Sequence, residues 1–429
     1  MNRRDSIKTG AFSTAPKVCG LLAAGAVFAA FAGPDLKALT KEKWSDEVRP
    51  QVLRFFEEEV YGAQPPKPAK LEFELAEYGY AFKGLARRRQ YVVHAEDAKG
   101  KLDFNVLVYL PLEMILPKEL RGKGGTIPVF VYPNFCGNWT LTDDPKVFEY
   151  TGYNYPDKRD KKRGSRPDRV CVEEILRRGY GFATFCFNEV YPDDYARDVT
   201  AESVWGIFDP AALPEEKLAH PAWTWGSIRV RDLLERLPEI DQTKVAIVGQ
   251  SRMGKNAINT GVRDARFALT CANCGGTKSL RHLPNLMYPS WFSRKLTKYV
   301  QTDQTGLTVE ELERRAAPFP RPPFDQSAYI ACIAPRAVVI STATGDKVSR
   351  PEGSRALFEE TEPVFNLYGK SLGWHIKEGK HSITHEDWRW FMDYAEKTLG
   401  WYKSPLPAAA SSASSSPPAA SNSTKSSFK

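Results

Sequence analysis

The chain alternates short apolar runs with stretches of helical periodicity, and this alternation predicts its fold. Residues 102–110 alternate apolar and polar side chains and then end in a continuous apolar run, which predicts a strand. A short apolar run at 127–132 predicts a second strand. A helix is expected over 172–178, where Gly179 ends it, and a strand follows over 180–185. This order of elements is typical of α/β proteins.

The same order continues through the second half of the chain. A helical stretch at 227–237 precedes the apolar strand 244–248, a further helix begins at Met253, and a β-branched run covers 337–342. Strands that are apolar throughout are buried on both faces. We therefore expect the α/β class, with a mostly parallel central sheet and helices on both of its faces.

The last helix has the clearest predicted boundaries. Thr384 stands three residues before Asp387, which predicts a capping box at its start, and Gly400 predicts its end. Between these limits, five side chains recur at helical spacing and predict a face turned toward the core: Trp388, Phe391, Met392, Ala395 and Leu399.

The two ends of the chain differ in composition from the rest. Arg3 and Arg4 precede an apolar stretch that is too short to span a bilayer, which predicts a signal peptide of the twin-arginine type over 1–32. A membrane anchor that is not cleaved is the alternative. Ser, Ala and Pro dominate 404–429, so this tail cannot bury enough apolar surface to fold. We expect one folded domain over 33–403 in an exported protein, periplasmic or secreted.

The composition of the 429 residues is that of an ordinary globular protein, with 42% apolar and 26% charged residues. The net charge of +8 does not indicate a nucleic-acid partner, because the basic residues are dispersed among nearly as many acids. We interpret the one basic run, at 158–166, as a solvated loop. The seven cysteines lack the paired spacing of a zinc site, so no metal or other cofactor is predicted. A disulfide between Cys271 and Cys274 stays open.

Ser251 follows a buried strand and precedes a helix, in the sequence Val-Ala-Ile-Val-Gly-Gln-Ser-Arg-Met-Gly-Lys at 245–255. The nucleophile of an α/β hydrolase stands at such a place, because a sharp turn lifts its hydroxyl above the edge of the sheet. Gly249 suits this turn, since a side chain there would clash. The usual pentapeptide is not met, because Met253 takes the second position after the serine and glycine follows as Gly254.

A serine nucleophile needs a base and an acid, and chain order restricts the candidates. His381 lies in a polar loop between the last predicted strand and the final helix, so we expect it to converge with Ser251 at the carboxyl edge of the sheet. Asp346 follows the strand at 337–342, and the order serine, aspartate, histidine is the one that α/β hydrolases use. The next candidates are His385 for the base, and Glu352 and Asp325 for the acid.

Around these residues the chain resembles the glucuronoyl esterases. The segment 249–255, Gly-Gln-Ser-Arg-Met-Gly-Lys, is similar to the family motif, in which arginine follows the nucleophilic serine and glycine and lysine come one residue later. The resemblance covers roughly residues 128–391. Further similar segments lie at 134–138, 178–184, 265–269, 333–336 and 375–381.

The resemblance implies an α/β-hydrolase catalytic domain that needs no metal and is secreted. It implies hydrolysis of the ester between a glucuronic acid side group of xylan and an alcohol of lignin. By position it implies Ser251 as the nucleophile, His381 as the general base, and Arg252 as an oxyanion stabiliser through its backbone N–H and guanidinium. The candidates for contact with the substrate are Lys255, Gln326 and Trp139.

Several positions depart from the commoner family pattern. Cys274 occupies the position of the catalytic glutamate of many members, whereas Asp346 fits the version in which the acid follows a later strand. Val348 stands where tryptophan is expected, and Trp139 replaces a histidine. The segment 278–291 is shorter than usual and lacks a glutamate expected near the sugar. These changes bear on uronate recognition more than on catalysis.

The sequence therefore predicts a serine carboxylic-ester hydrolase that acts on a uronate ester of a plant or algal polysaccharide or oligosaccharide. An esterase for another acylated carbohydrate or a small ester is the alternative enzyme. A carbohydrate-binding homologue without activity is the alternative outside enzymes. We expect a monomer with no nucleic-acid partner and no stable membrane insertion after the signal peptide is removed.

Overall fold

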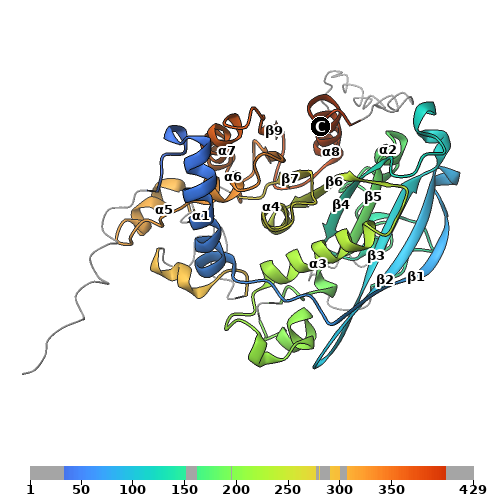
Figure 1. Ribbon diagram of the computed structural model, residues 1–429, viewed down its shortest axis with the longest axis horizontal. Helices are drawn as coiled ribbons and strands as arrows, with labels where there is room; N and C mark the ends of the chain where they lie inside the picture. Colours follow the sequence, from blue (N-terminus) through green and yellow to red (C-terminus); the bar gives the residue numbers. More distant parts are fainter. Residues whose placement is uncertain are drawn as a thin grey trace, which may run out of the picture.

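The central sheet has the strand order β1-β2-β3-β5-β4-β6-β7-β8-β9, as the computed structural model shows (Figure 1). The structure describes residues 33–150, 162–194, 196–276, 280, 290–299 and 307–401. The first three strands are antiparallel, β3 pairs antiparallel with β5, and the strands from β5 to β9 in this order are mutually parallel. The strands are β1 Lys70–Ala81, β2 Ala86–Asp97, β3 Gly100–Pro111, β4 Ile127–Asn134, β5 Gly181–Cys186, β6 Ile240–Gln250, β7 Leu269–Asn273, β8 Ala337–Ala343 and β9 Gly373–Lys377.

Helices cover both faces of the sheet (Figure 1). Successive strand residues point to opposite faces, so Val131 packs in the core beneath α3, α4, α6 and α7 while Phe130 packs in the core beneath α2 and α8. Phe130 meets Trp388 of α8 edge to face, with ring centroids 5.9 Å apart. The helices are α1 Arg49–Phe55, α2 Val172–Arg177, α3 Ala219–Leu234, α4 Arg252–Arg263, α5 Val309–Ala316, α6 Gln326–Ala331, α7 Pro351–Asn366 and α8 His385–Leu399.

The predicted α/β class, with its mostly parallel sheet and helices on both faces, is confirmed. Every predicted strand lies within an observed strand except at 180–185, where β5 begins one residue later. The predicted capping box between Thr384 and Asp387 is present at the start of α8. The prediction for α3 was wrong at its start, because the helix begins at Ala219 rather than Ser227 and carries the buried Trp223 and Trp225 before that point.

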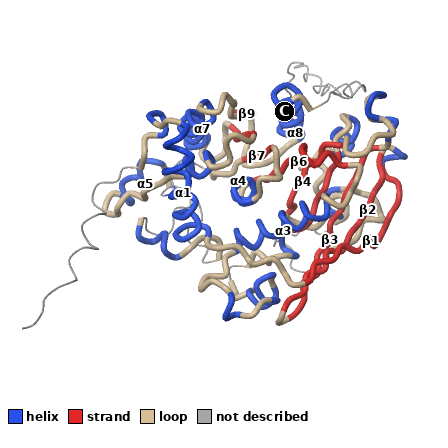
Figure 2. Tube along the Cα trace, in the orientation of Figure 1, coloured by secondary structure: helices blue, strands red, loops and turns tan. Residues whose placement is uncertain are grey.

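The hairpin β1–β2 and strand β7 were not predicted. Figure 2 shows β1, β2 and β3 as a long ribbon at one edge of the molecule. Strand β1 is an edge strand with exposed residues on both of its faces, so its sequence carries little apolar signal. Strand β7 has five residues, Leu-Thr-Cys-Ala-Asn, which include one β-branched side chain. Burial between two neighbouring strands determines β7, and a local pattern does not show such burial.

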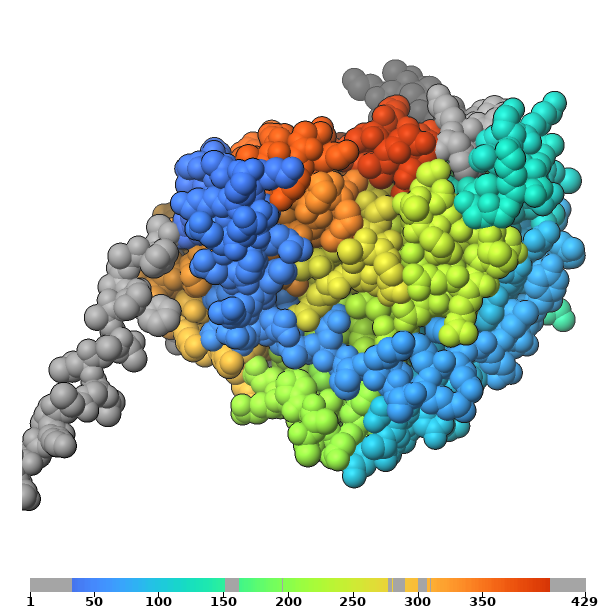
Figure 3. Space-filling model, viewed as in Figure 1, coloured from blue at the N-terminus to red at the C-terminus, as the bar shows by residue number. Residues whose placement is uncertain are grey.

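The N-terminal segment packs against the C-terminal half of the domain. Figure 3 shows it on the surface beside the later helices. Phe56 stacks on Tyr329 of α6 with ring centroids 4.2 Å apart, and Arg49 donates a hydrogen bond to the carbonyl of Cys332 at 3.2 Å. None of the described helices has the length and apolar character needed to cross a bilayer. The predicted signal peptide at 1–32 and tail at 404–429 lie outside the described residues.

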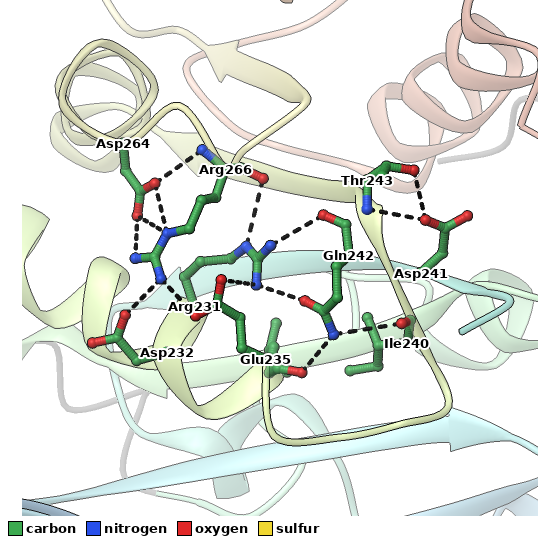
Figure 4. A network of polar contacts seen from close by, with 10 residues as sticks. Arg231, Asp232, Glu235, Ile240, Asp241, Gln242, Thr243, Asp264 and Arg266 are labelled. Atoms are coloured by element: carbon green, nitrogen blue, oxygen red, sulfur yellow. Dashed lines mark hydrogen bonds and ion pairs between the residues drawn. The ribbon is translucent and has the colours of Figure 1, made fainter. Parts of the chain in front are cut away.

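A polar network joins α3 to the start of β6 (Figure 4). The buried Arg231 donates to the side chain of Gln242 at 2.7 Å and to its carbonyl at 3.0 Å. Arg266, in the loop after α4, donates to Asp264 at 2.6 Å and to Asp232 of α3 at 2.8 Å. The network lies near the amino end of β6, so it supports the strand that carries Ser251 without reaching the carboxyl edge.

A second network lies at the carboxyl edge, and its three central side chains, Asn273, Lys377 and Asp387, are buried. Asp387 in the first turn of α8 accepts hydrogen bonds from Thr384 N–H at 2.8 Å, from Asn273 of β7 at 2.9 Å, and from Lys377 of β9 at 2.6 Å. Lys377 also donates to the carbonyl of Ser382 at 2.7 Å. One buried ion pair therefore joins β7, β9, α8 and the loop before α8.

We expect Asp387→Asn to destabilise the protein by about 3–5 kcal/mol, because Lys377 is then left buried without a counter-charge. The measurement is the free energy of unfolding from urea denaturation at neutral pH. The matched control is Glu359→Gln, which breaks an exposed helical pair with Arg355 and should cost less than about 1 kcal/mol. Equal stability of the two variants would contradict this account of the network.

Candidate active site

Ser251 occupies a strained turn between β6 and α4. Its backbone has φ 59° and ψ −123°, a region that non-glycine residues rarely enter. A side chain on Gly249 would overlap the carbonyl of Met253, so glycine is required where the chain reverses. A Cβ on Gly254 would lie 2.7 Å from the carbonyl oxygen of Asn273, because α4 passes close to the end of β7. This close approach explains why glycine stands three residues after the serine.

The structure brings Ser251, His381 and Asp346 into one hydrogen-bonded chain. His381 Nε2 lies 2.8 Å from Ser251 Oγ, and His381 Nδ1 lies 2.9 and 3.0 Å from the two carboxylate oxygens of Asp346. The backbone N–H groups of Val348 and Ser349 both donate to Asp346 Oδ1 at 2.9 Å. These contacts fix the carboxylate beneath the imidazole, so the tautomer with a proton on Nδ1 is favoured and Nε2 can accept the serine proton.

The buried carboxyl of Asp346 is kept ionised by its partners. Burial acts to raise its pKa, but the hydrogen bond and positive charge of His381, the N–H of Ser349 and the thiol of Cys274 outweigh this and lower the pKa to about 2. Burial, followed by the charge of Asp346 and the hydrogen bond to it, raises the pKa of the Cys274 thiol well above its usual value. Cys274 is therefore a neutral donor to Asp346 rather than a second anion.

Cys274, Asp346 and His381 also form the single cluster of potential metal ligands found among the described residues, with ligand atoms within 4.8 Å of one another. The carboxylate of Asp346 already forms hydrogen bonds with His381 and Cys274, and the thiol of Cys274 keeps its proton. The cysteines of the described residues are all buried, and none of them is in a disulfide.

Arg252 lies at the first position of α4 and borders the same cavity as Ser251. Its guanidinium forms an ion pair with the buried Asp193 and lies over the ring of Trp291, 4.5 Å from the centroid. Trp291 Nε1 donates to Asp193 at 2.8 Å. The side chain is therefore held in one position, while the positive end of the α4 dipole lies beside Ser251.

A cavity of about 300 Å³ opens beside Ser251 and His381. Its walls come from the end of β4, the 3-10 turn Asn138–Leu141, the loop at 162–170, the start of α4 and the loop after β8. Residues that sequence reasoning missed here are Arg166 and Arg169, which belong to or follow the basic run that we interpreted as a solvated loop. Nothing in a local run of charges shows which of its side chains fold back over a cavity.

Three predicted substrate contacts do not line this cavity. Lys255 is 4% exposed, and burial, then the charge of Arg252, lowers its pKa to about 8. Gln326 is buried and donates to Tyr61 Oη at 3.2 Å. Trp139 packs in the core beneath α2 and α8. None of these three is among the residues that line the cavity in the described part of the chain.

The other candidates for the base and the acid do not contact Ser251 or His381 in the hydrogen bonds of the described residues. His385 Nε2 donates to the carbonyl of Pro167 at 2.8 Å, whereas the histidine at Ser251 Oγ is His381. Glu352 is an exposed residue of α7, and Asp325 accepts a hydrogen bond from Leu280 N–H at 2.9 Å. Most of the segment 278–291, which the resemblance to the glucuronoyl esterases led us to expect to be short, lies outside the described residues.

We expect Asp346→Asn to lower kcat on 4-nitrophenyl acetate by about 10⁴-fold, because an amide cannot stabilise the imidazolium of His381. Cys274→Ala should lower kcat less than about tenfold, because one neutral hydrogen bond contributes about 1 kcal/mol. Both variants are compared with the parent by steady-state kinetics after a check of folding by circular dichroism. Equal kcat of Asp346→Asn and the parent would remove Asp346 from this role.

Comparison with known proteins connects this geometry to one family. A sequence profile described as "Glucuronyl esterase, fungi" matches residues 173–369. The chain is 26% identical to carbohydrate esterase MZ0003 of an unknown prokaryotic organism, over 84% of this chain and 86% of that protein. It is 31% identical over 141 residues to a 4-O-methyl-glucuronoyl methylesterase of Hypocrea jecorina, which covers 28% of this chain and 27% of the relative.

The solved structures agree with the sequence comparisons. A glucuronoyl esterase from Solibacter usitatus superposes with a TM-score of 0.71 at 27% identity, over 86% of this chain and 99% of that one. A carbohydrate esterase family 15 enzyme described as promiscuous, from a marine bacterial metagenome, also gives 0.71 at 26% identity, over 87% and 98%. The chain has the α/β-hydrolase fold, and its sequence and structure are similar to those of glucuronoyl esterases, which are carboxylic ester hydrolases.

Proposed function

We propose that this protein is a serine esterase that cleaves esters of glucuronic acid side groups on plant or algal polysaccharides. The observation that carries the proposal is the hydrogen-bonded chain Ser251–His381–Asp346 at the border of an open cavity. Similarity to solved and curated proteins that are described as glucuronoyl esterases supports the choice of substrate. The substrate is a polysaccharide or an oligosaccharide, and the protein acts as an exported monomer, periplasmic or secreted.

The proposed reaction proceeds in two steps through an acyl-enzyme. Ser251 Oγ bonds to the ester carbonyl carbon while His381 Nε2 takes its proton, and the bond to the alcohol oxygen then breaks as His381 returns that proton to the alcohol. A water molecule next bonds to the same carbon and gives a proton to His381. The bond to Oγ breaks, Ser251 regains the proton, and the uronic acid is released, so that ester and water give acid and alcohol.

The oxyanion of each step forms beside the start of α4. The backbone N–H groups in the first turn of a helix have no partner within the helix and point outward from its amino end, where they can bind an anion. Arg252 contributes its N–H from this position, and its guanidinium adds positive charge nearby although Asp193 offsets part of it. Such preorganised donors stabilise a developing oxyanion by several kcal/mol, about 3 for one donor.

The proposal predicts release of methanol from methyl glucuronate by the parent protein and none above background by Ser251→Ala. Methanol release is measured beside hydrolysis of 4-nitrophenyl acetate. Hydrolysis of the acetate without release of methanol would point to another acylated carbohydrate or small ester. Hydrolysis of neither ester would leave a carbohydrate-binding homologue without activity.

A matched variant tests the sugar contact that we propose for Lys255. Because Lys255 offers a charged donor, Lys255→Met should raise KM for methyl glucuronate by about tenfold while KM for 4-nitrophenyl acetate stays unchanged. The pKa of about 8 means that Lys255 loses its charge above that pH, so KM of the parent should rise there and KM of the variant should not. The control is Lys397→Met at an exposed position of α8.

A further inference from the structure

Cys274, Asp346 and His381 place three different types of metal ligand beside the cavity. Their sulfur, carboxylate oxygen and imidazole nitrogen atoms lie within 4.8 Å of one another. Cys274 and Asp346 are buried, and His381 borders the cavity. In the proposed esterase reaction Cys274 has a single role, the hydrogen bond that its thiol donates to Asp346. The sulfur therefore offers a metal-binding chemistry that the reaction does not use.

The separations of the three atoms suit a zinc ion. Zn²⁺ binds a cysteine sulfur at about 2.3 Å, and a histidine nitrogen or a carboxylate oxygen at about 2.0–2.2 Å, usually in a tetrahedron. In such a tetrahedron the ligand atoms are about 3.3–3.6 Å apart. His381 Nδ1 lies 2.9 Å from Asp346 Oδ1, and the whole cluster lies within 4.8 Å. Side-chain shifts of about 1 Å therefore bring the three ligands to one Zn²⁺, with water in the fourth position.

Charge and ligand type favour Zn²⁺ over Mg²⁺ in this cluster. Asp346 is ionised, since its partners lower its pKa to about 2. A thiol binds a metal as the thiolate, so Cys274 and Asp346 together supply two negative charges that neutralise Zn²⁺. The buried complex then carries no net charge, which avoids the cost of an unpaired buried ion. Thiolate and imidazole ligands suit Zn²⁺, whereas Mg²⁺ prefers oxygen ligands.

Binding of Zn²⁺ blocks the base of the triad. The thiol of Cys274 gives its proton to the solvent when the sulfur binds the metal. The proton on His381 Nδ1 also leaves, and the ring takes up a proton on Nε2, so that the imidazole stays neutral while Nδ1 binds the metal. Nε2 then faces Ser251 Oγ, 2.8 Å away, as a donor and cannot accept the serine proton.

We propose that Cys274, Asp346 and His381 form a zinc site through which Zn²⁺ reversibly inhibits the esterase. The inference goes beyond the proposed function, because no step of the proposed reaction uses a metal. Zn²⁺ reaches the site from the cavity, which His381 and Val348 both line, and the Val348 side chain is 39% exposed. Cys274 is the ligand that gives the site its preference for Zn²⁺.

The test measures inhibition of 4-nitrophenyl acetate hydrolysis by ZnCl₂ in the full chain. We expect Zn²⁺ to inhibit the parent, EDTA to restore its rate, and MgCl₂ at the same concentration to have no effect. Cys274→Ser keeps a hydroxyl donor but removes the thiolate. The Zn²⁺ concentration for half inhibition should rise about 10–100-fold in this variant, since loss of even an outer partner of a zinc ligand costs that much. Each rate is compared with that of the same variant without Zn²⁺.

A direct measurement of metal binding accompanies the kinetics. Co²⁺ occupies zinc sites, and a cysteine thiolate bound to it gives a charge-transfer absorption band in the near ultraviolet. The band should appear in the parent and be absent in Cys274→Ser. The matched control is Cys136→Ser, which removes another cysteine that borders the same cavity. This variant should change neither the half-inhibition concentration nor the band.

Inhibition and a Co²⁺ band that both depend on Cys274 would support the inference. Three results would overturn it while leaving the esterase intact: no inhibition of the active parent, equal inhibition of the parent and Cys274→Ser, or a band that Cys136→Ser removes. A parent that hydrolyses neither 4-nitrophenyl acetate nor methyl glucuronate would instead overturn the proposed function, and the Co²⁺ band would still decide whether the zinc site exists.

Discussion

The geometry of the site depends on one buried side chain, Asn273, at the carboxyl end of β7. Its backbone carbonyl accepts the N–H of Ser251 at 2.9 Å and so holds the strained turn after β6. Its side-chain amide donates to Asp387 at 2.9 Å, and Asp387 in turn binds Lys377, which holds the loop that follows His381. Nucleophile and base come from distant parts of the chain, and this buried chain of hydrogen bonds fixes the distance between them.

Cys274, which the resemblance places where many glucuronoyl esterases carry a catalytic glutamate, leaves the electrostatics of the site intact. A thiol buried beside a carboxylate keeps its proton, so Cys274 adds a donor to Asp346 instead of a competing negative charge. The acid comes from the loop after β8, one strand farther from Ser251, and the imidazole reaches both partners because it lies between them.

The sequence predicts the fold and the triad candidates because both have local signals. The strand before Ser251 ends in a continuous apolar run, and the sharp turn that carries Ser251 needs Gly249. The capping box at Thr384 marks the start of the helix that follows the loop of His381. The cavity walls have no such signal, since Arg166 reaches the cavity only through tertiary contacts of its loop. Burial of Lys255 also depends on packing between distant segments, which a motif does not describe.

The most direct test of the account is covalent labelling of the protein with a fluorophosphonate probe, followed by peptide mass spectrometry. Such a probe reacts with a serine whose hydroxyl is activated by a neighbouring base. The account predicts one adduct per chain, located on Ser251. No adduct on the folded protein, or an adduct on a different serine, would contradict the claim that His381 and Asp346 activate Ser251.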